Sequence, residues 1–205
     1  MRKLLLGLLL SSQPLLGVTY RFPKVIPAST LTIPIIGEIS RESLPLAGLV
    51  LAYPGNDIHM TIDSPGGSIF AMSAILRAME HRKANGATIT CIVNGMAASA
   101  AFTILTHCTK RIVIEHSYLL FHDARVILPT GTVVDRALAK ELYEDLDRMY
   151  HSELARLLRD LPMDKDLVKL HYDNETFFEA TELEALMQDH QWMEVYPALR
   201  LVDTP

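Results

Sequence analysis

The feature that most constrains the fold is Ser64-Pro65-Gly66-Gly67-Ser68, a turn sequence between two regular segments. Proline and paired glycines force a tight turn and let the backbone approach another segment closely. Residues 57–63 before it are typical of a strand, residues 68–84 have helical spacing, and residues 87–93 form the next apolar run. Strand, turn, helix and strand make a βαβ unit, which predicts a parallel strand pair and an α/β fold.

The rest of the chain supplies further elements of the same kind. The whole sequence has 205 residues, which is enough for one domain with a full core. Thr132 to Leu161 predicts a helix far longer than the average of about 11–12 residues. Such a helix either packs against another chain or lies across the sheet. The other expected elements are strands at 31–38, 111–115 and 118–121, a short extended piece at 176–178, and helices at 44–53, 164–172 and 179–193.

Ser99 is the candidate nucleophile. It follows the apolar run and the turn Asn94-Gly95-Met96, and it lies in the small-residue segment Ala97 to Leu105, which predicts a buried helix. Strand, glycine turn and helix place its hydroxyl at an exposed corner beside the free N–H groups of the first helical turn. Acyl transfer needs such an arrangement. The alternative interpretation is a serine that serves only as the helix N-cap.

His122 is the candidate base, because it comes directly after the apolar run Tyr118 to Phe121. Open α/β sheets present their sites at strand ends, where a histidine can act on a nearby nucleophile. The alternative is a structural hydrogen-bond partner. The other histidines lie within a strand, on helices or in turns and are less favoured: His59, His81, His107, His116, His151, His171 and His190.

Charge and cysteine content exclude several functions. The net charge is −5 and no stripe of Lys or Arg is present, which argues against a nucleic-acid partner. Cys91 and Cys108 lie in or beside apolar segments without metal-ligand spacing, so we interpret both as core thiols, with a disulfide as the alternative. No ligand cluster predicts a metal, and no glycine-rich phosphate loop predicts a cofactor.

The first twenty residues differ from the rest and are separated from the expected domain, residues 21–205. Arg2 and Lys3 precede the apolar stretch Leu4 to Leu10, a pattern typical of a secretory signal peptide. The stretch is too short and interrupted to predict a membrane span. Residues 1–17 therefore predict export or membrane association, with an apolar arm that docks on a neighbouring subunit of a cytoplasmic protein as the alternative.

Four motifs in this order carry a family resemblance: Ile62 to Ser68, Gly95 to Ser99, the strand-end His122, and Phe177 to Ala180. Together they resemble the proteolytic subunit of the Clp protease, in the ClpP/crotonase superfamily. The resemblance implies a serine endopeptidase with a crotonase-like spiral of ββα units and a long handle helix. It also implies a homo-oligomer of seven-subunit rings, single or double, that degrades peptides or unfolded proteins delivered by an AAA+ unfoldase.

Carried over by motif, the resemblance implies Ser99 as nucleophile, His122 as base, and the amides of Gly67 and Ala100 as the oxyanion hole. The family's third residue is an Asp, and the matching position here is Glu175. We favour Glu175 by register, with Asp173 as the alternative acid; either carboxylate could fix the tautomer of the base.

The chain departs from the family after the base, where His122 is followed by Asp123-Ala124 in place of Gln-Pro. We expect Asp123 to raise the pKa of His122 if the side chains meet. The competing functions are a Ser-Lys dyad like that of signal peptide peptidases, with Lys140 or Lys110 as base, and a catalytically inactive ring subunit. An acyl-CoA-handling crotonase fits less well, and a phage-type head-maturation protease would share the Clp mechanism.

Overall fold

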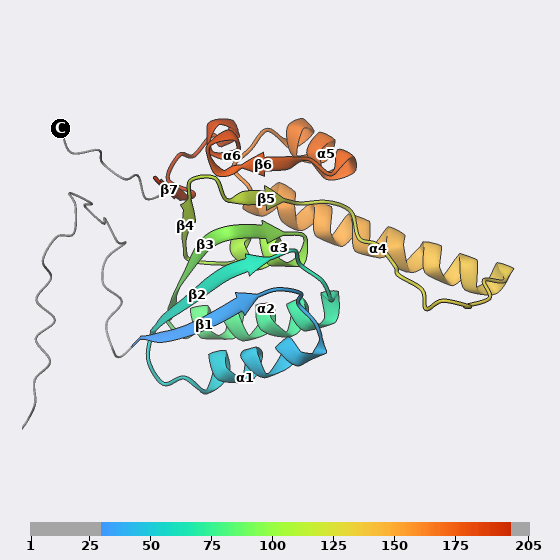
Figure 1. Ribbon diagram of the computed structural model, residues 1–205, viewed down its shortest axis with the longest axis horizontal. Coiled ribbons are helices and arrows are strands. Elements are labelled where there is room, and N and C mark those ends of the chain that lie inside the picture. Colours follow the sequence, from blue (N-terminus) through green and yellow to red (C-terminus); the bar gives the residue numbers. More distant parts are fainter. Residues whose placement is uncertain (1–29, 198–205) are drawn as a thin grey trace, which may run out of the picture.

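The computed structural model describes residues 30–197, which form a mixed α/β fold around one sheet (Figure 1). Five parallel strands lie in the order β1-β2-β3-β4-β7, and β5 pairs with β3 while β6 pairs with β5. In chain order the elements are β1 Leu31–Ile36, η1 Arg41–Ser43, α1 Leu44–Ala52, β2 Asp57–Ser64, α2 Ile69–Ala84, β3 Thr88–Ala98, α3 Ala100–Thr106, β4 Lys110–Ile114, β5 Tyr118–Leu120, α4 Arg136–Asp160, α5 Lys165–Asn174, β6 Phe177–Glu179, α6 Ala180–Leu186 and β7 Glu194–Tyr196.

The predicted βαβ unit consists of β2, α2 and β3, and β2 pairs with β3 in parallel as expected. The turn after Ser64 connects β2 to α2. The N-cap of α2, Ser68, accepts a hydrogen bond from the Ala71 N–H. Figure 1 shows α1 and α2 side by side on one face of the sheet. The strands bury alternate apolar side chains against these helices, among them Ile33, Ile58 and Ile89, so the core lies between sheet and helices.

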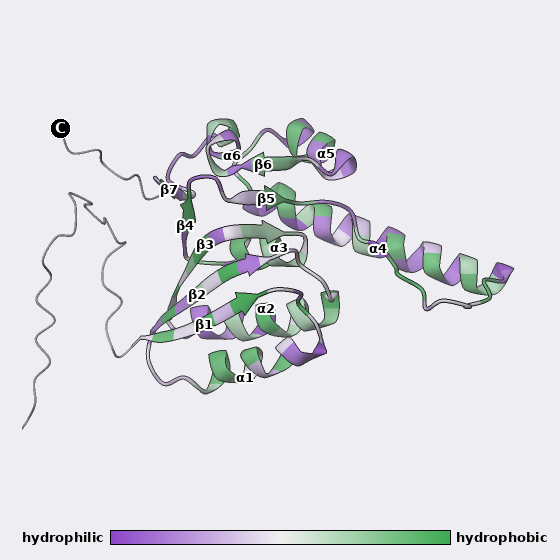
Figure 2. Ribbon diagram, in the orientation of Figure 1, coloured by the Kyte–Doolittle hydropathy of each residue, from purple (hydrophilic) through white to green (hydrophobic). Residues whose placement is uncertain are grey.

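The long helix α4 extends away from the rest of the molecule (Figure 1). It begins at Arg136 rather than Thr132, because Asp135 caps it through the Leu138 N–H at 2.8 Å. Its only buried residues, Leu154 and Leu157, lie in the half near the sheet. Apolar and polar positions also alternate along its outer half (Figure 2), so an amphipathic face continues beyond the contacts this chain provides.

Two predicted helices have different boundaries. The helix expected at 97–105 begins at Ala100, because β3 continues to Ala98 and pairs there with β5. The helix expected at 179–193 is wrong beyond α6. The backbone becomes extended at Met187, which ends α6, and the next residue, Gln188, donates its N–H to Pro162 O. Further along, β7 pairs with β4 in parallel. Residues 187–193 are irregular, and hydrogen bonds to the end of α4 and the residues after it hold them, including Trp192 Nε1–H to Asp160 O at 2.9 Å, so tertiary contacts outweigh helical spacing there.

Cys91 and Cys108 form a disulfide, so the interpretation as free core thiols is wrong. Both are almost completely buried, one in β3 and one just after α3, with their Cα atoms 5.9 Å apart. The bond therefore ties the strand before Ser99 to the end of the helix after it.

The predicted signal-like segment, residues 1–20, lies outside the described residues. Within residues 30–197, no helix has both the length and the apolar character needed to cross a membrane.

Candidate active site

Ser99 occupies the junction between β3 and α3 in an unusual backbone conformation. Its φ is 55° and its ψ is −123°, which few residues other than glycine adopt. Its N–H donates to Leu120 O on β5 at 2.8 Å, and its own carbonyl accepts from the Thr103 N–H at 3.1 Å. The hydroxyl does not cap α3. Ser99 is thus the N-cap residue of α3 by position, but it does not cap the helix with its side chain, and that partly exposed side chain is left available for another role.

The Pro-Gly-Gly turn lies directly against this junction. A Cβ on Gly66 would stand 2.5 Å from Ala98 O, 2.7 Å from Ser99 Cβ and 2.9 Å from Ala100 N. Only glycine fits there, because the contact is closer than any side chain allows and φ is +94°. Gly67 is held in a bridge with Ile39, through bonds from Ile39 N–H to Gly66 O and from Ser68 N–H to Ile39 O, both 2.7 Å.

Ala100 is the first residue of α3, where a helix offers no acceptor to the backbone N–H. Gly66, the residue before Gly67 in the turn, packs beside that amide. The two amides predicted for the oxyanion hole thus come from segments that touch, and their role remains a prediction.

Strand register brings the candidate base and acid to the same place. In parallel β3 and β5, Ala98 is opposite Leu120, so the chain that leaves β5 toward His122 passes beside the start of α3. In antiparallel β5 and β6, Leu120 is opposite Phe177. In an antiparallel pair, two residues forward on one strand correspond to two residues back on the other. His122 therefore lies opposite Glu175.

The side chains meet as this register implies. His122 Nδ1 lies 3.7 Å from Glu175 Oε1, which is longer than a hydrogen bond. The imidazole is largely buried, and Nδ1 has no hydrogen-bond partner among the described residues. The same oxygen, Glu175 Oε1, forms an ion pair with the Arg125 guanidinium. Sequence reasoning did not single out Arg125, because it lies in a loop without a motif.

Burial determines the direction of the His122 pKa. Desolvation lowers it below the ordinary value of 6.5, and the Arg125 charge lowers it further, while the nearby backbone and the charge of Asp123 raise it. The expected effect of Asp123 therefore exists but does not dominate. A base with a lowered pKa is neutral, and so able to accept a proton, at pH 7.

The alternative acid and bases have other partners. Asp173 accepts from Lys169 at 2.6 Å and from Tyr150 at 3.0 Å on an exposed surface. Lys140 is three-quarters exposed on the outer half of α4, beside Glu144, and Lys110 is exposed at the start of β4. The structure does not bring any of these three beside His122 or Ser99.

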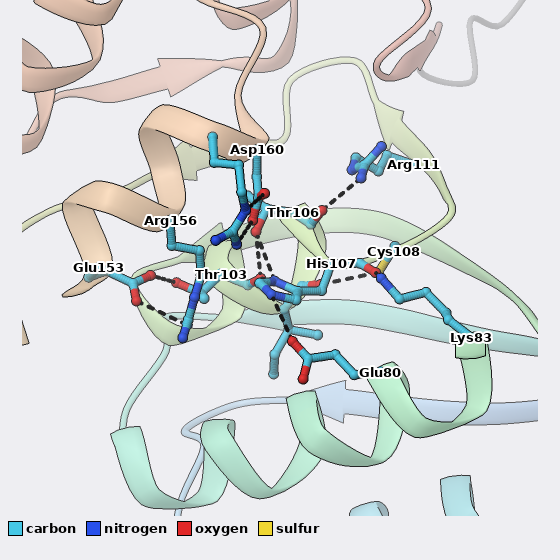
Figure 3. Close-up of polar contacts among 12 residues, drawn as sticks. Glu80, Lys83, Thr103, Thr106, His107, Cys108, Arg111, Glu153, Arg156 and Asp160 are labelled. Carbon is cyan, nitrogen blue, oxygen red and sulfur yellow. Dashed lines mark hydrogen bonds and ion pairs between the residues drawn. The ribbon is translucent and has the colours of Figure 1, made fainter. Parts of the chain in front are cut away.

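A second polar cluster, drawn in Figure 3, anchors the far end of α3, the helix that follows Ser99. Arg111 donates to Leu105 O, Thr106 O and Trp192 O, and its guanidinium lies 4.4 Å from the centre of the Trp192 ring. Lys83, from α2, donates to His107 O at 2.7 Å. Two cations thus satisfy the last carbonyls of α3, where the helix dipole favours positive charge.

The side of α3 is held as well. Thr103, one turn after Ser99, donates its hydroxyl to Glu153 Oε1 on α4 at 2.5 Å, and Arg156 supports that carboxylate at 3.1 Å (Figure 3). Every residue of α3 is buried. The position of Ser99 is consequently fixed by α2, α4, β4 and the disulfide together. Sequence reasoning missed these contacts, since scattered single residues supply them.

Comparison with known proteins places this chain in a family. The sequence matches the Clp protease family over residues 41–200, which is most of the chain, and we conclude that the chain belongs to it. The mixed α/β sheet with a long projecting helix agrees with that membership, so the resemblance drawn from the four motifs and the predicted fold class are confirmed.

Several proteolytic subunits are similar to it. The chain is 34% identical over 131 residues to ATP-dependent Clp protease proteolytic subunit 3 of Rhodococcus jostii (strain RHA1), covering 60% of this chain and 63% of that protein. It is 32% identical over 121 residues to subunit 1 of Bifidobacterium longum (strain NCC 2705), covering 54% and 51%. The chain thus spans only about half to just under two thirds of the length of these relatives.

Proposed function

We propose that this protein is a serine endopeptidase of the Clp type, with Ser99 as nucleophile, His122 as base and Glu175 as acid. The observation that carries the proposal is the strand register, since β3, β5 and β6 deliver these three residues to one end of the sheet. The strained backbone of Ser99 and the lowered pKa of His122 support it, because both are features of sites built for chemistry.

The proposed reaction passes through an acyl-enzyme. His122 takes the proton of the Ser99 hydroxyl as that oxygen attacks the peptide carbonyl, and it then gives the proton to the leaving amine. The amides of Gly67 and Ala100 stabilise the oxyanion. A water activated by His122 finally hydrolyses the ester. Glu175 stabilises the imidazolium that forms in both steps.

The assembly that we propose is a homo-oligomeric ring or double ring joined through α4. The outer half of that helix has an amphipathic face without buried residues in this chain, and a second subunit would cover it. Size-exclusion chromatography with light scattering should show an oligomer at micromolar concentration, and a monomer would contradict this proposal. Peptides or unfolded proteins would be the substrates, with an AAA+ unfoldase as partner.

The test of the proposed function is labelling with a fluorophosphonate probe at pH 7 to 8. Wild type should label, whereas Ser99→Ala and His122→Ala should not, since one lacks the nucleophile and the other lacks the base. Lys140→Ala is the matched control, because that lysine is exposed and paired with Glu144. Loss of labelling with Lys140→Ala but not with His122→Ala would contradict the triad and favour a Ser-Lys dyad.

A further inference from the structure

We propose that Arg125 is a positioning residue that holds the carboxylate of Glu175 away from His122, so that the triad is unaligned in the state described here. The inference rests on the proposed function, because it concerns the same three side chains. It assigns a role to a residue outside the family motif.

The first step of the argument is competition for one atom. Glu175 Oε1 is the oxygen nearest to His122 Nδ1 and also the oxygen that pairs with the Arg125 guanidinium. A carboxylate binds a guanidinium more strongly than it binds the N–H of a neutral imidazole, because the guanidinium and the carboxylate carry opposite full charges. The carboxylate therefore lies with Arg125, and the distance to His122 stays at 3.7 Å.

The second step is the state of the imidazole. His122 Nδ1 is buried and has no hydrogen-bond partner among the described residues. A buried polar atom without a partner is unfavourable, so the site gains if Glu175 moves toward it. The charged groups that face His122 are Asp123, Arg125 and Glu175. Asp123 Oδ1 accepts the Ala124 N–H at 2.6 Å, whereas Glu175 Oε1 lies 3.7 Å from Nδ1, so Glu175 is the carboxylate beside that atom.

The third step is the location of Arg125. The residue lies three positions after the base, in the loop between β5 and α4, and its side chain is 64% exposed. Its partner Glu175 is the αL residue that ends α5, just before β6. The ion pair thus joins two exposed segments, and a bound peptide or a neighbouring subunit that draws Arg125 away would release the acid.

The test replaces the cation while keeping the size and polarity of the side chain. Arg125→Gln should raise the fluorophosphonate labelling rate about fivefold, the factor given by one net hydrogen bond. The gain should vanish in a Glu175→Gln background, because Arg125 acts only through that carboxylate. Arg77→Gln is the matched control, since Arg77 is an exposed arginine on α2, outside the proposed site and the proposed interface, and it should label as wild type. An unchanged or lower rate for Arg125→Gln would overturn the proposal, as would a gain that persists with Glu175→Gln.

A second readout is independent of the reaction. NMR titration of His122 in the Ser99→Ala protein should show that Arg125→Gln raises the pKa of His122, because a nearby cation is lost and a carboxylate approaches. A protected, strongly downfield Nδ1–H resonance should appear at the same time. Absence of both changes would refute the proposal even if labelling occurs. A wild-type protein that fails to label would contradict the proposed function alone, since the titration still decides the role of Arg125.

Discussion

Replacing Gly66 with alanine tests the close approach on which the site is built. The added Cβ would lie 2.5 Å from Ala98 O and 2.7 Å from Ser99 Cβ. Nonbonded neighbours of a Cβ essentially never come closer than 3.0 Å, so these atoms must separate by about 0.5 Å. The atoms that move belong to Ser99, the proposed nucleophile, and to Ala98 just before it.

Two costs to stability follow for Gly66→Ala. A residue with a Cβ at φ +94° costs about 1–2 kcal/mol. Forcing a methyl group into a packed contact costs about 1–3 kcal/mol more. The free energy of unfolding should therefore fall by about 2–5 kcal/mol. Reactivity should fall as well, because a displacement of about 1 Å can cost 100-fold, so half that displacement predicts about a tenfold slower labelling of Ser99.

The variant Gly86→Ala separates the cost of a positive φ from the cost of the steric contact. Gly86 has a similar φ of +86° after α2, and its Cβ would meet nothing within 4 Å. This variant should lose only about 1–2 kcal/mol and label at the wild-type rate. Thermal unfolding and labelling kinetics measure both variants under the same conditions. Equal losses in Gly66→Ala and Gly86→Ala, or wild-type labelling by Gly66→Ala, would refute the reasoning.

Three further outcomes are expected. Reduction of the Cys91–Cys108 disulfide, whose cysteines are 17 residues apart, should destabilise the wild type by about 3 kcal/mol in thermal unfolding; an equal effect of reductant on the Cys91→Ala, Cys108→Ala double variant would contradict this. The labelling rate should fall as pH drops through the pKa of His122, with a midpoint below 6.5, because burial lowers that pKa and only the neutral imidazole accepts a proton; a midpoint above 6.5 would contradict the burial argument. Glu175→Gln should slow labelling at least about tenfold, since the acid orients the base, while Asp173→Asn should not; the reverse order would assign the acid to Asp173.

The fold class could be predicted from the sequence because the residue pattern within each main segment indicates whether it forms a strand, a turn or a helix. The turn at residues 64–68 and the apolar runs beside it are sufficient to predict β2, α2 and β3. The C-terminal strand β7 could not be predicted, because Glu194–Tyr196 is a strand only by pairing with β4, more than 80 residues earlier. Helical spacing over residues 179–193 likewise gives no sign that the helix ends at Leu186, because the contacts of Gln188 and Trp192 with Pro162 and Asp160 come from a distant segment.

The candidate site also combines residues that have a local sequence signal with residues that only long-range contacts reveal. Sequence and register indicated Ser99, His122 and Glu175 as candidates, and the structure brings the latter two within 3.7 Å. Arg125 and the contacts that hold α3 had no local signal, because they join side chains from distant segments. The disulfide is no more than an alternative from sequence, since a spacing of 17 residues does not imply that the two cysteines are in contact.

The backbone of Ser99 implies a trade-off between stability and activity. A non-glycine residue held at φ 55° and ψ −123° costs of order 1–3 kcal/mol, and the anchored ends of α3 maintain it. Glycine would relieve this strain, so Ser99→Gly should unfold at a higher temperature than wild type while it loses the hydroxyl. The fold thus keeps a strained backbone at the residue that carries its proposed chemistry, and selection for stability alone would remove that residue.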